Sequence, residues 1–483
     1  MTSPSPASER TIPLPTTPVI SGPVTAALTS DSTIAPSTAP LRSSNGSSTT
    51  PPPKAPPASP RRGLRQAILH AVLHTPPSFY AITMGTGITS ILLHNYPYQG
   101  HWLQYLGVIV FVLNIIIFSI LTISNILRYT IYHGLFCTVA KHNVASMFWG
   151  CMPMGFSTIV NMVCFVCVEA WGERWAYAAF GLWWVNVLLA VLVNFGMIFV
   201  LFTRQSQTPA SLAPTWLLPI VGTVVVAASG AVVAQSLAPY NAGLARSTIL
   251  CSFVIWGTGV PPALMIITLW IYRAAMQGPP APAALASVFL PLGPCGQGAF
   301  GIISMGVGVR TLAYKYSFPI IPGLTEAEGA QRIADAIYAG CVLTGLVLWG
   351  LALLWYTIAV ALFLDQWRKD WRLLGPGKFS VGLWALTFPI GVFATSTIVL
   401  AAELRSPAFK VIAAFLSAQV ILHFLYVGGA TLWITITGAI YNAPEIAGAD
   451  VYTRKEWSRR VADDIEAGCG DEPAAAAVEK ATR

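Results

Sequence analysis

The sequence is poor in charged residues. Only 10% of its 483 residues are charged, with 19 acidic and 27 basic side chains, whereas 55% are hydrophobic. Soluble domains carry about 25% charged residues, so this chain has too few charges to cover a water-exposed surface. The composition therefore predicts a protein that lies mostly in lipid.

The first sixty residues lack the apolar segment of a secretory signal and consist mainly of Ser, Thr, Pro and Ala. We expect residues 1–65 to form a disordered cytosolic arm, because such a composition cannot bury enough apolar surface to fold. Residues 66–440 are predicted to form a transmembrane transport domain, and residues 441–483 a cytosolic tail.

The chain also lacks the side-chain combinations that several kinds of site require. Seven of its eight cysteines lie in or beside apolar runs, which argues against an extracellular disulfide framework. The pair Cys164 and Cys167 has no second pair of zinc ligands, and the glycines of 293–301 follow no strand and precede no phosphate-binding lysine. Basic residues are scattered rather than clustered. We expect no cofactor, no metal, no nucleic-acid partner and no enzymatic activity.

What the chain does contain is a series of long apolar runs. A membrane-spanning helix needs about 20 predominantly apolar residues, and ten such runs separated by short loops can be counted. We place them at residues 76–94, 102–127, 144–168, 175–203, 213–235, 247–272, 284–309, 334–364, 380–402 and 408–437.

An even number of spans puts both termini on one side. Near the spans, the side of the termini carries sixteen Lys and Arg residues and the opposite side seven. Cytosolic loops are enriched in these residues, so both termini are predicted to be cytosolic.

The odd-numbered spans share a pattern in which proline is followed by small residues. It occurs after Pro76, Pro153, Pro219, Pro291 and Pro389. The even-numbered spans are bulky instead, so the repeat is a helical hairpin. Because disrupted or small-residue helices in a membrane need protein or water beside them, we predict an all-α polytopic protein whose odd helices line a central pore. The sixth span breaks the pattern, since it carries Pro261 and Pro262 near its middle.

The middles of the spans have essentially no carboxylate or lysine, so the usual groups of a proton-coupled pump are missing. Uncharged polar groups and kinked backbone can hydrogen-bond an anion without trapping it, although a hydroxyl can equally bond back to its own helix. The predicted pore-lining residues are Gly85, Thr86, Gly87, Pro153, Gly155, Ser157, Thr158, Asn161, Pro219, Gly222, Thr223, Pro291, Gly293, Gln297, Gly298, Gly301, Pro389 and Thr395.

Arg310 ends the seventh span, which is the richest in glycine. It can act as an interfacial anchor or attract anions at the mouth of the pore.

Three stretches resemble fungal sulfite efflux pumps of the tellurite-resistance/dicarboxylate transporter family, which also contains malate permeases and plant slow anion channels. They are MGTGI to LLHNYPY at 84–98, PMGFSTIVN at 153–161 and GPCGQGAFG at 293–301. The resemblance covers roughly residues 76–437 and implies five helical hairpins with quasi-fivefold symmetry. It also implies that the pore exports sulfite across the plasma membrane, that Phe388 occludes it, and that the protein can form homo-oligomers.

Three other functions stay open at this stage. A malate or dicarboxylate permease would need a wider pore and an arginine to bind each carboxylate, and the spans carry no arginine in their middles. A membrane-embedded enzyme would need converging His, Asp, Glu or Cys residues. A receptor would signal through the two tails.

Overall fold

The computed structural model describes residues 64–323, 327–370, 379–438 and 440. Within these ranges the chain is helical and contains no β-strand. The predicted tail at 441–483 and nearly all of the predicted arm at 1–65 lie outside the described residues.

Helices occur at all ten predicted spans. The odd-numbered spans contain α2 (Tyr80–His94), α5 (Cys151–Met162), α8 (Leu217–Leu237), α10 (Leu292–Lys315) and α12 (Trp384–Glu403), and the even-numbered spans contain α3 (His101–Ile131), α7 (Glu173–Thr203), α9 (Ala242–Gln277), α11 (Ala327–Lys369) and α13 (Pro407–Ile436). In the described chain, nine segments are long and apolar enough to cross a membrane. The exception is α2, whose 15 residues measure about 22 Å at a rise of 1.5 Å per residue.

Shorter elements complete the chain. They are α1 (Leu64–Leu73), α4 (Leu135–Lys141), α6 (Glu169–Trp171), a π-helical turn η3 (Val163–Val168), and the 3₁₀ turns η1 (Pro77–Phe79), η2 (Ala145–Gly150), η4 (Pro209–Ser211), η5 (Pro214–Trp216), η6 (Pro282–Phe289) and η8 (Val381–Leu383).

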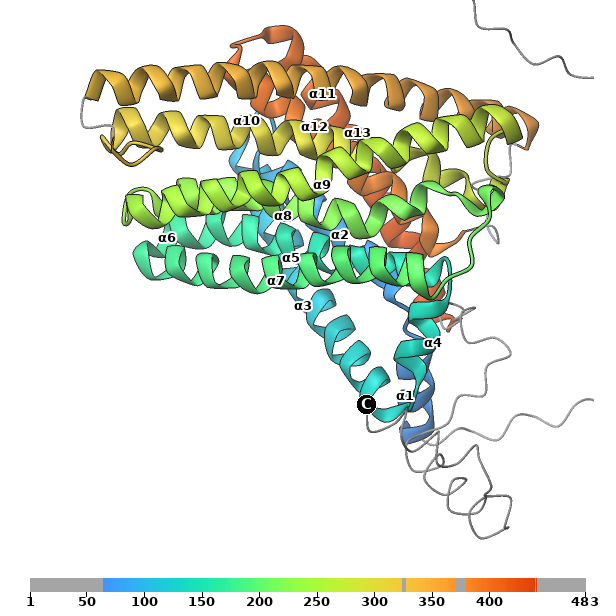
Figure 1. Cartoon of the computed structure of the whole chain (residues 1–483). Coiled ribbons are helices and arrows are strands. Elements are labelled where there is room, and N and C mark those ends of the chain that lie inside the picture. Colours follow the sequence, from blue (N-terminus) through green and yellow to red (C-terminus); the bar gives the residue numbers. More distant parts are fainter. Residues whose placement is uncertain (1–63, 324–326, 371–378, 439, 441–483) are drawn as a thin grey trace, which may run out of the picture. The chain divides into compact units, whose positions relative to one another are not determined.

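The five odd helices form a closed ring. Each contacts the next in the order α2, α5, α8, α10 and α12, and α12 returns to contact α2. Each outer helix packs against the inner helix that precedes it in its hairpin and also against the next inner helix of the ring. Figure 1 shows two of these hairpins, α8 with α9 and α10 with α11, running side by side. The predicted all-helical membrane fold is therefore confirmed, and the contacts agree with five hairpins around an inner ring.

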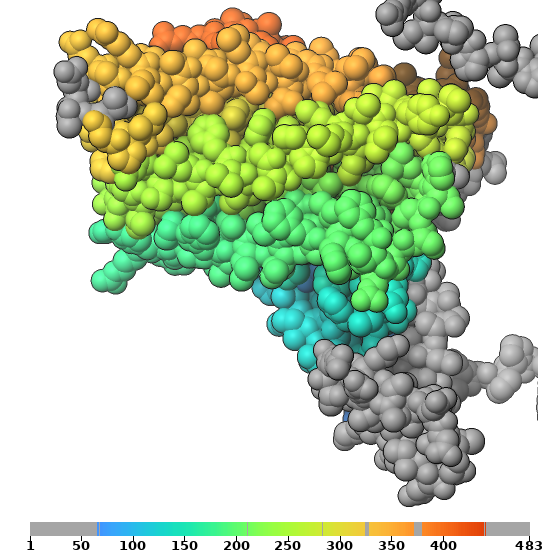
Figure 2. All heavy atoms as spheres, in the orientation of Figure 1, coloured from blue at the N-terminus to red at the C-terminus, as the bar shows by residue number. Residues whose placement is uncertain are grey.

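Burial separates the two rings. In the four inner spans that are long enough to cross a membrane, 72–100% of the most apolar 18-residue window is buried, against 22–33% in the outer spans. In α2, 14 of the 15 residues are buried. Large apolar side chains such as Ile116, Leu192 and Leu422 project outward from the outer helices, and Figure 2 shows atoms of α7, α9 and α11 over most of one face. An exposed apolar surface of this kind fits contact with lipid.

Glycines bring the inner helices close together. A Cβ on Gly296 would lie 2.9 Å from the backbone nitrogen of Phe393, and one on Gly301 would lie 3.0 Å from the Cβ of Ala228. Glycines also meet the neighbouring helix at the α2/α5, α5/α8 and α12/α2 contacts, through Gly155, Gly222 and Gly391. All five contacts of the ring thus include a glycine that leaves room for the adjacent helix.

The prolines of the inner helices lie elsewhere than predicted. Pro153 and Pro219 are each the third residue of their helix, and Pro291 directly precedes α10. Proline fits the first turn because the N–H groups there have no partner within the helix. The expectation of kinks inside these helices is therefore wrong for these three residues, whereas Pro389 does lie inside α12.

The structure also explains the proline pair, Pro261 and Pro262, in the sixth span. Pro262 cannot donate the hydrogen bond that Thr258 would accept in a regular helix. The carbonyl oxygen of Thr258 instead accepts a bond from Asn194 Nδ2 at 3.4 Å, and the same nitrogen donates to Thr223 Oγ1 at 3.2 Å. The proline thereby frees a carbonyl that links α7 to α9 beside the inner helix α8.

Candidate functional site

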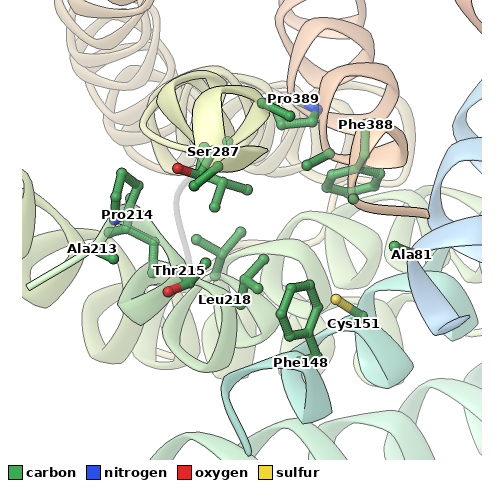
Figure 3. Close-up of a pocket in the computed structure, with 18 of the residues that line it drawn as sticks. Ala81, Phe148, Cys151, Ala213, Pro214, Thr215, Leu218, Ser287, Phe388 and Pro389 are labelled. Carbon is green, nitrogen blue, oxygen red and sulfur yellow. The ribbon is translucent and has the colours of Figure 1, made fainter. Parts of the chain in front are cut away.

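The first halves of the inner helices surround a cavity of about 420 Å³. Residues from all five inner helices line it, together with residues of η2 and of the segment before α8. The lining is mostly apolar, and Arg273 is the one charged side chain among its described lining residues. Figure 3 shows the rings of Phe388 and Phe148 projecting into this cavity, with Cys151 between Phe148 and Ala81.

Residues farther along the same helices surround another cavity, of about 510 Å³. Its lining is more polar, with the amides and hydroxyls of Asn95, Gln99, Thr158, Asn161, Gln235, Ser236, Gln297, Ser304 and Thr395. Among the described residues that line it, none carries an ionisable side chain. The two cavities thus lie one after the other along the inner helices.

Phe388 lines both cavities. It directly precedes Pro389 in α12 and is 2% exposed. No other described residue belongs to the lining of both. A single aromatic side chain therefore lies at the boundary between the two spaces.

The inner helices are parallel. Residues early in each inner helix line the first cavity, and later residues line the second. The N-terminal end of each helix carries a partial positive charge from the aligned peptide dipoles, equivalent to about half an elementary charge. Five such termini and Arg273 give the first cavity a positive field that favours an anion.

Seven of the residues predicted from the sequence line these cavities. Gly293, Phe388 and Pro389 line the first, and the second is lined by Phe388 together with Thr158, Asn161, Gln297 and Thr395.

The other predicted residues of the path contact a neighbouring helix, bond to their own helix or lie at the start of a helix. Gly85 lies against Trp384, Gly87 against Thr158 and Asn114, Gly155 against Thr83, Gly222 against Pro153, Gly298 against Val260, and Gly301 against Ala228. Ser157 and Thr223 accept bonds from Asn186 and Asn194, and Thr86 donates to Ile82 O. Pro153, Pro219 and Pro291 begin the inner helices.

Hydrogen bonding divides the polar side chains of the second cavity. The hydroxyl of Thr158 donates to Gly155 O at 2.7 Å, and that of Thr395 donates to Val392 O at 3.0 Å. Gln235 donates to Ser304 O at 3.1 Å. In contrast, no described residue bonds to the amide of Gln297 or the hydroxyl of Ser304, which are 4% and 5% exposed. These two groups, unlike the threonines, keep their hydrogens for the cavity.

Arg310 lies apart from both cavities. Its Nε is 3.1 Å from Asp335 Oδ1, and its guanidinium lies over the ring of Tyr338. Tyr314 donates to the same carboxylate, and Tyr338 donates to Glu403. Arg310 and Glu403 line a separate cavity of about 400 Å³ beside the second half of α10. Much of the arginine's charge is therefore balanced locally.

The cavity residues that the sequence reasoning missed include Gln235, Phe148 and Arg273. Gln235 follows a run of small and β-branched residues near the end of its helix, and Phe148 precedes the proline of its span. Arg273 directly follows the sixth predicted span, at a position where a basic residue usually acts as an interfacial anchor. A signal was available only for Gln235, as a lone amide in an otherwise apolar inner helix.

Comparison with known proteins places these features in context. The profile of the voltage-dependent anion channel family matches residues 74–432. A sulfite efflux pump of Arthroderma benhamiae is 37% identical over 366 residues, which are 76% of this chain and 92% of that protein. A sulfite efflux pump of Trichophyton rubrum is 36% identical with the same coverage. A malic acid transport protein of Schizosaccharomyces pombe is 24% identical over 335 residues, 69% of this chain and 72% of that protein.

Proposed function

This chain belongs to the voltage-dependent anion channel family, and we propose that it exports sulfite from the cytosol across the plasma membrane. The observation that carries the proposal is the pair of cavities enclosed by all five inner helices, with Phe388 between them. The relatives described as sulfite efflux pumps match over nearly their whole length, and this supports sulfite as the substrate.

The proposed path runs from the first cavity to the second. Both termini are cytosolic in this proposal, by the excess of basic residues on their side, so the first cavity opens toward the cytosol. Arg273 and the five helix N-termini attract the anion there, and the anion then passes Phe388 into the uncharged second cavity. Pro389, Gly293, Thr158, Asn161, Gln297 and Thr395 line this path.

The membrane potential supplies the driving force in this proposal. An inside-negative potential favours the exit of an anion by about 2.3 kcal/mol per charge per 100 mV. The spans offer no carboxylate or lysine in their middles for proton coupling. Uniport through a gated path therefore suffices for export.

Phe388 is the proposed gate, and its removal is the test. Protein reconstituted in vesicles loaded with sulfite, at a set potential, is expected to release sulfite faster after Phe388→Ala, because the side chain that separates the cavities is gone. Phe409→Ala is the control, since Phe409 packs against Trp349 outside the ring. An equal or slower release from Phe388→Ala than from the natural chain would contradict the gate.

Malate transport is the alternative, because the Schizosaccharomyces pombe relative is described as a malic acid transport protein. Its discriminator is the same assay with malate inside the vesicles. Malate release that matches or exceeds sulfite release would show that the protein is a malate transporter. Absence of any anion release would instead favour a receptor.

Two further parts of the proposal concern the surface. Arg310 attracts anions to the outer mouth, to the extent that Asp335 leaves its charge unbalanced. The apolar outer helices contact lipid, and some of that surface serves contact between copies in a homo-oligomer.

A further inference from the structure

The second cavity differs from the first in its charge. The first contains Arg273 and faces five helix N-termini, whereas the described lining of the second offers only neutral polar groups. Transfer of an ion out of water costs free energy that grows with the square of its charge. A dianion therefore loses about four times as much hydration energy as a monoanion on entering a neutral cavity. Neutral donors must compensate for that loss.

The buried donors that remain for an anion are few, because Asn95, Gln99 and Ser236, which also line the cavity, are partly or fully exposed to solvent. Thr158 and Thr395 direct their hydrogens to their own helices. Gln297 and Ser304 have none of the described residues as partners and are separated by seven residues on α10, so they share one helix face. Asn161 adds a third group from α5. Its Oδ1 is occluded without a donor, so its amide nitrogen is the polar atom that the cavity can reach.

We infer that the cavity beyond Phe388, through Asn161, Gln297 and Ser304, accepts singly charged oxyanions and rejects doubly charged ones. This inference rests on the proposed export of sulfite and narrows its substrate to hydrogensulfite. Three neutral donors bind a monoanion strongly enough to admit it and weakly enough to release it. They do not replace the hydration of the sulfite dianion.

The pH dependence of export follows from the substrate. Hydrogensulfite loses its proton near neutral pH, so at constant total sulfite the monoanion falls about tenfold per pH unit on the alkaline side. The described lining of the cavity carries no titratable group. Titratable side chains around the lining include His94, whose ring stacks on Phe165, and Cys164, which lies close to Ser236. Glu403 lies one turn of α12 beyond Val399, in a separate cavity with Arg310.

The experiment measures sulfite release and charge movement together, from vesicles at a fixed potential over a series of internal pH values. Release is expected to fall with the monoanion fraction, and one elementary charge should accompany each sulfite at every pH. A ratio approaching two charges, or release that is constant with pH, would overturn the inference. A vesicle series that releases no sulfite at any pH would instead refute the proposed function itself.

Four substitutions test whether the effect arises in the cavity. Gln297→Met removes a donor and is expected to slow release about tenfold, whereas Gln419→Met, in the outer helix α13, should not. Gln297→Lys adds a cation and is expected to restore sulfite release at alkaline pH, with nearly two elementary charges moved per sulfite. Misfolding cannot produce such a gain. His94→Gln should keep the pH profile of the natural chain. A shifted profile in His94→Gln, or unchanged selectivity in Gln297→Lys, would contradict the inference.

Discussion

Single glycines determine how closely the inner helices approach. The Cβ of an alanine at position 296 would lie within 3.0 Å of the backbone of Phe393, and backbone cannot rotate out of the way as a side chain can. The ring would have to widen at the contact of α10 with α12.

Gly296→Ala is accordingly expected to destabilise the protein by about 1–3 kcal/mol and to lower its melting temperature in detergent. Gly340→Ala is the matched control, because Gly340 lies in the outer helix α11 with no atom near its Cβ position. That control should be neutral or stabilising by up to about 1 kcal/mol through helix propensity. A common decrease for both variants would show that the ring contact has no special role.

The effect of Arg310 on anion entry depends on how much of its charge Asp335 balances. Its partner Asp335 is 45% exposed and the arginine 48%, so the pair is screened by salt. At low ionic strength, Arg310→Gln is expected to slow sulfite entry from the outer side, and Asp335→Asn to speed it, each by roughly the few-fold typical of local charge effects. Both differences should disappear in high salt. Rates that stay different there would point to a structural cause.

For the polar residues of the cavities, the sequence predicts which side chains line the path but not where their hydrogen bonds are directed. Thr158 and Asn161 occupy the same helix and both line the second cavity, so the sequence predicted both as contacts for the anion. Only the structure shows that Thr158 donates to Gly155 O while the amide nitrogen of Asn161 is left for the cavity. A hydroxyl has this choice because its own helix offers a carbonyl within reach; that choice depends on a side-chain rotamer, which a residue type does not specify.

Among the elements, α9 is linked to α7 by the hydrogen bond from Asn194 to Thr258 O, a carbonyl that Pro262 leaves without a partner within its helix. If Asn194 compensates the carbonyl that Pro262 leaves free, the two residues must be energetically coupled. Asn194→Leu is expected to destabilise the protein by about 1 kcal/mol, because Thr258 O then lacks a donor.

Pro262→Ala restores the missing backbone N–H. In that background, Asn194→Leu is expected to cost clearly less than in the natural chain, since Thr258 O then accepts a bond within α9. Unfolding of all four variants in denaturant provides the double-mutant cycle. Strictly additive effects would mean that the Asn194 bond does not depend on the proline.

The alternation of inner and outer helices was predictable from the sequence because glycine, proline and serine are poor lipid-facing residues, whereas Leu188 or Phe415 suits that role. The closure of the ring was not predictable from these residues. It depends on the contact between α2 and α12, which lie about 300 residues apart. The same limit applies to the inner prolines, whose position in a first turn rather than mid-helix depends on where each helix begins.

At the scale of the whole molecule, the parallel inner helices and the boundary at Phe388 define two compartments that should face opposite sides of the membrane. Ser287 lines the first cavity, where Figure 3 shows it beside the open space, and Ile398 lines the second. A charged thiol reagent that cannot cross lipid reports which compartment is open to which side.

Ser287→Cys is expected to react with such a reagent from the cytosolic side and Ile398→Cys from the outer side, measured in oriented vesicles against the natural chain, whose own cysteines give the background. Adding Phe388→Ala to either variant should allow a small reagent to reach the cysteine from both sides, because the side chain between the cavities is removed. Reaction of the two cysteines from the same side would contradict the direction of the path. One-sided reaction that persists without Phe388 would place the barrier at another residue, and Phe148, which projects into the first cavity from η2, would be the next to replace.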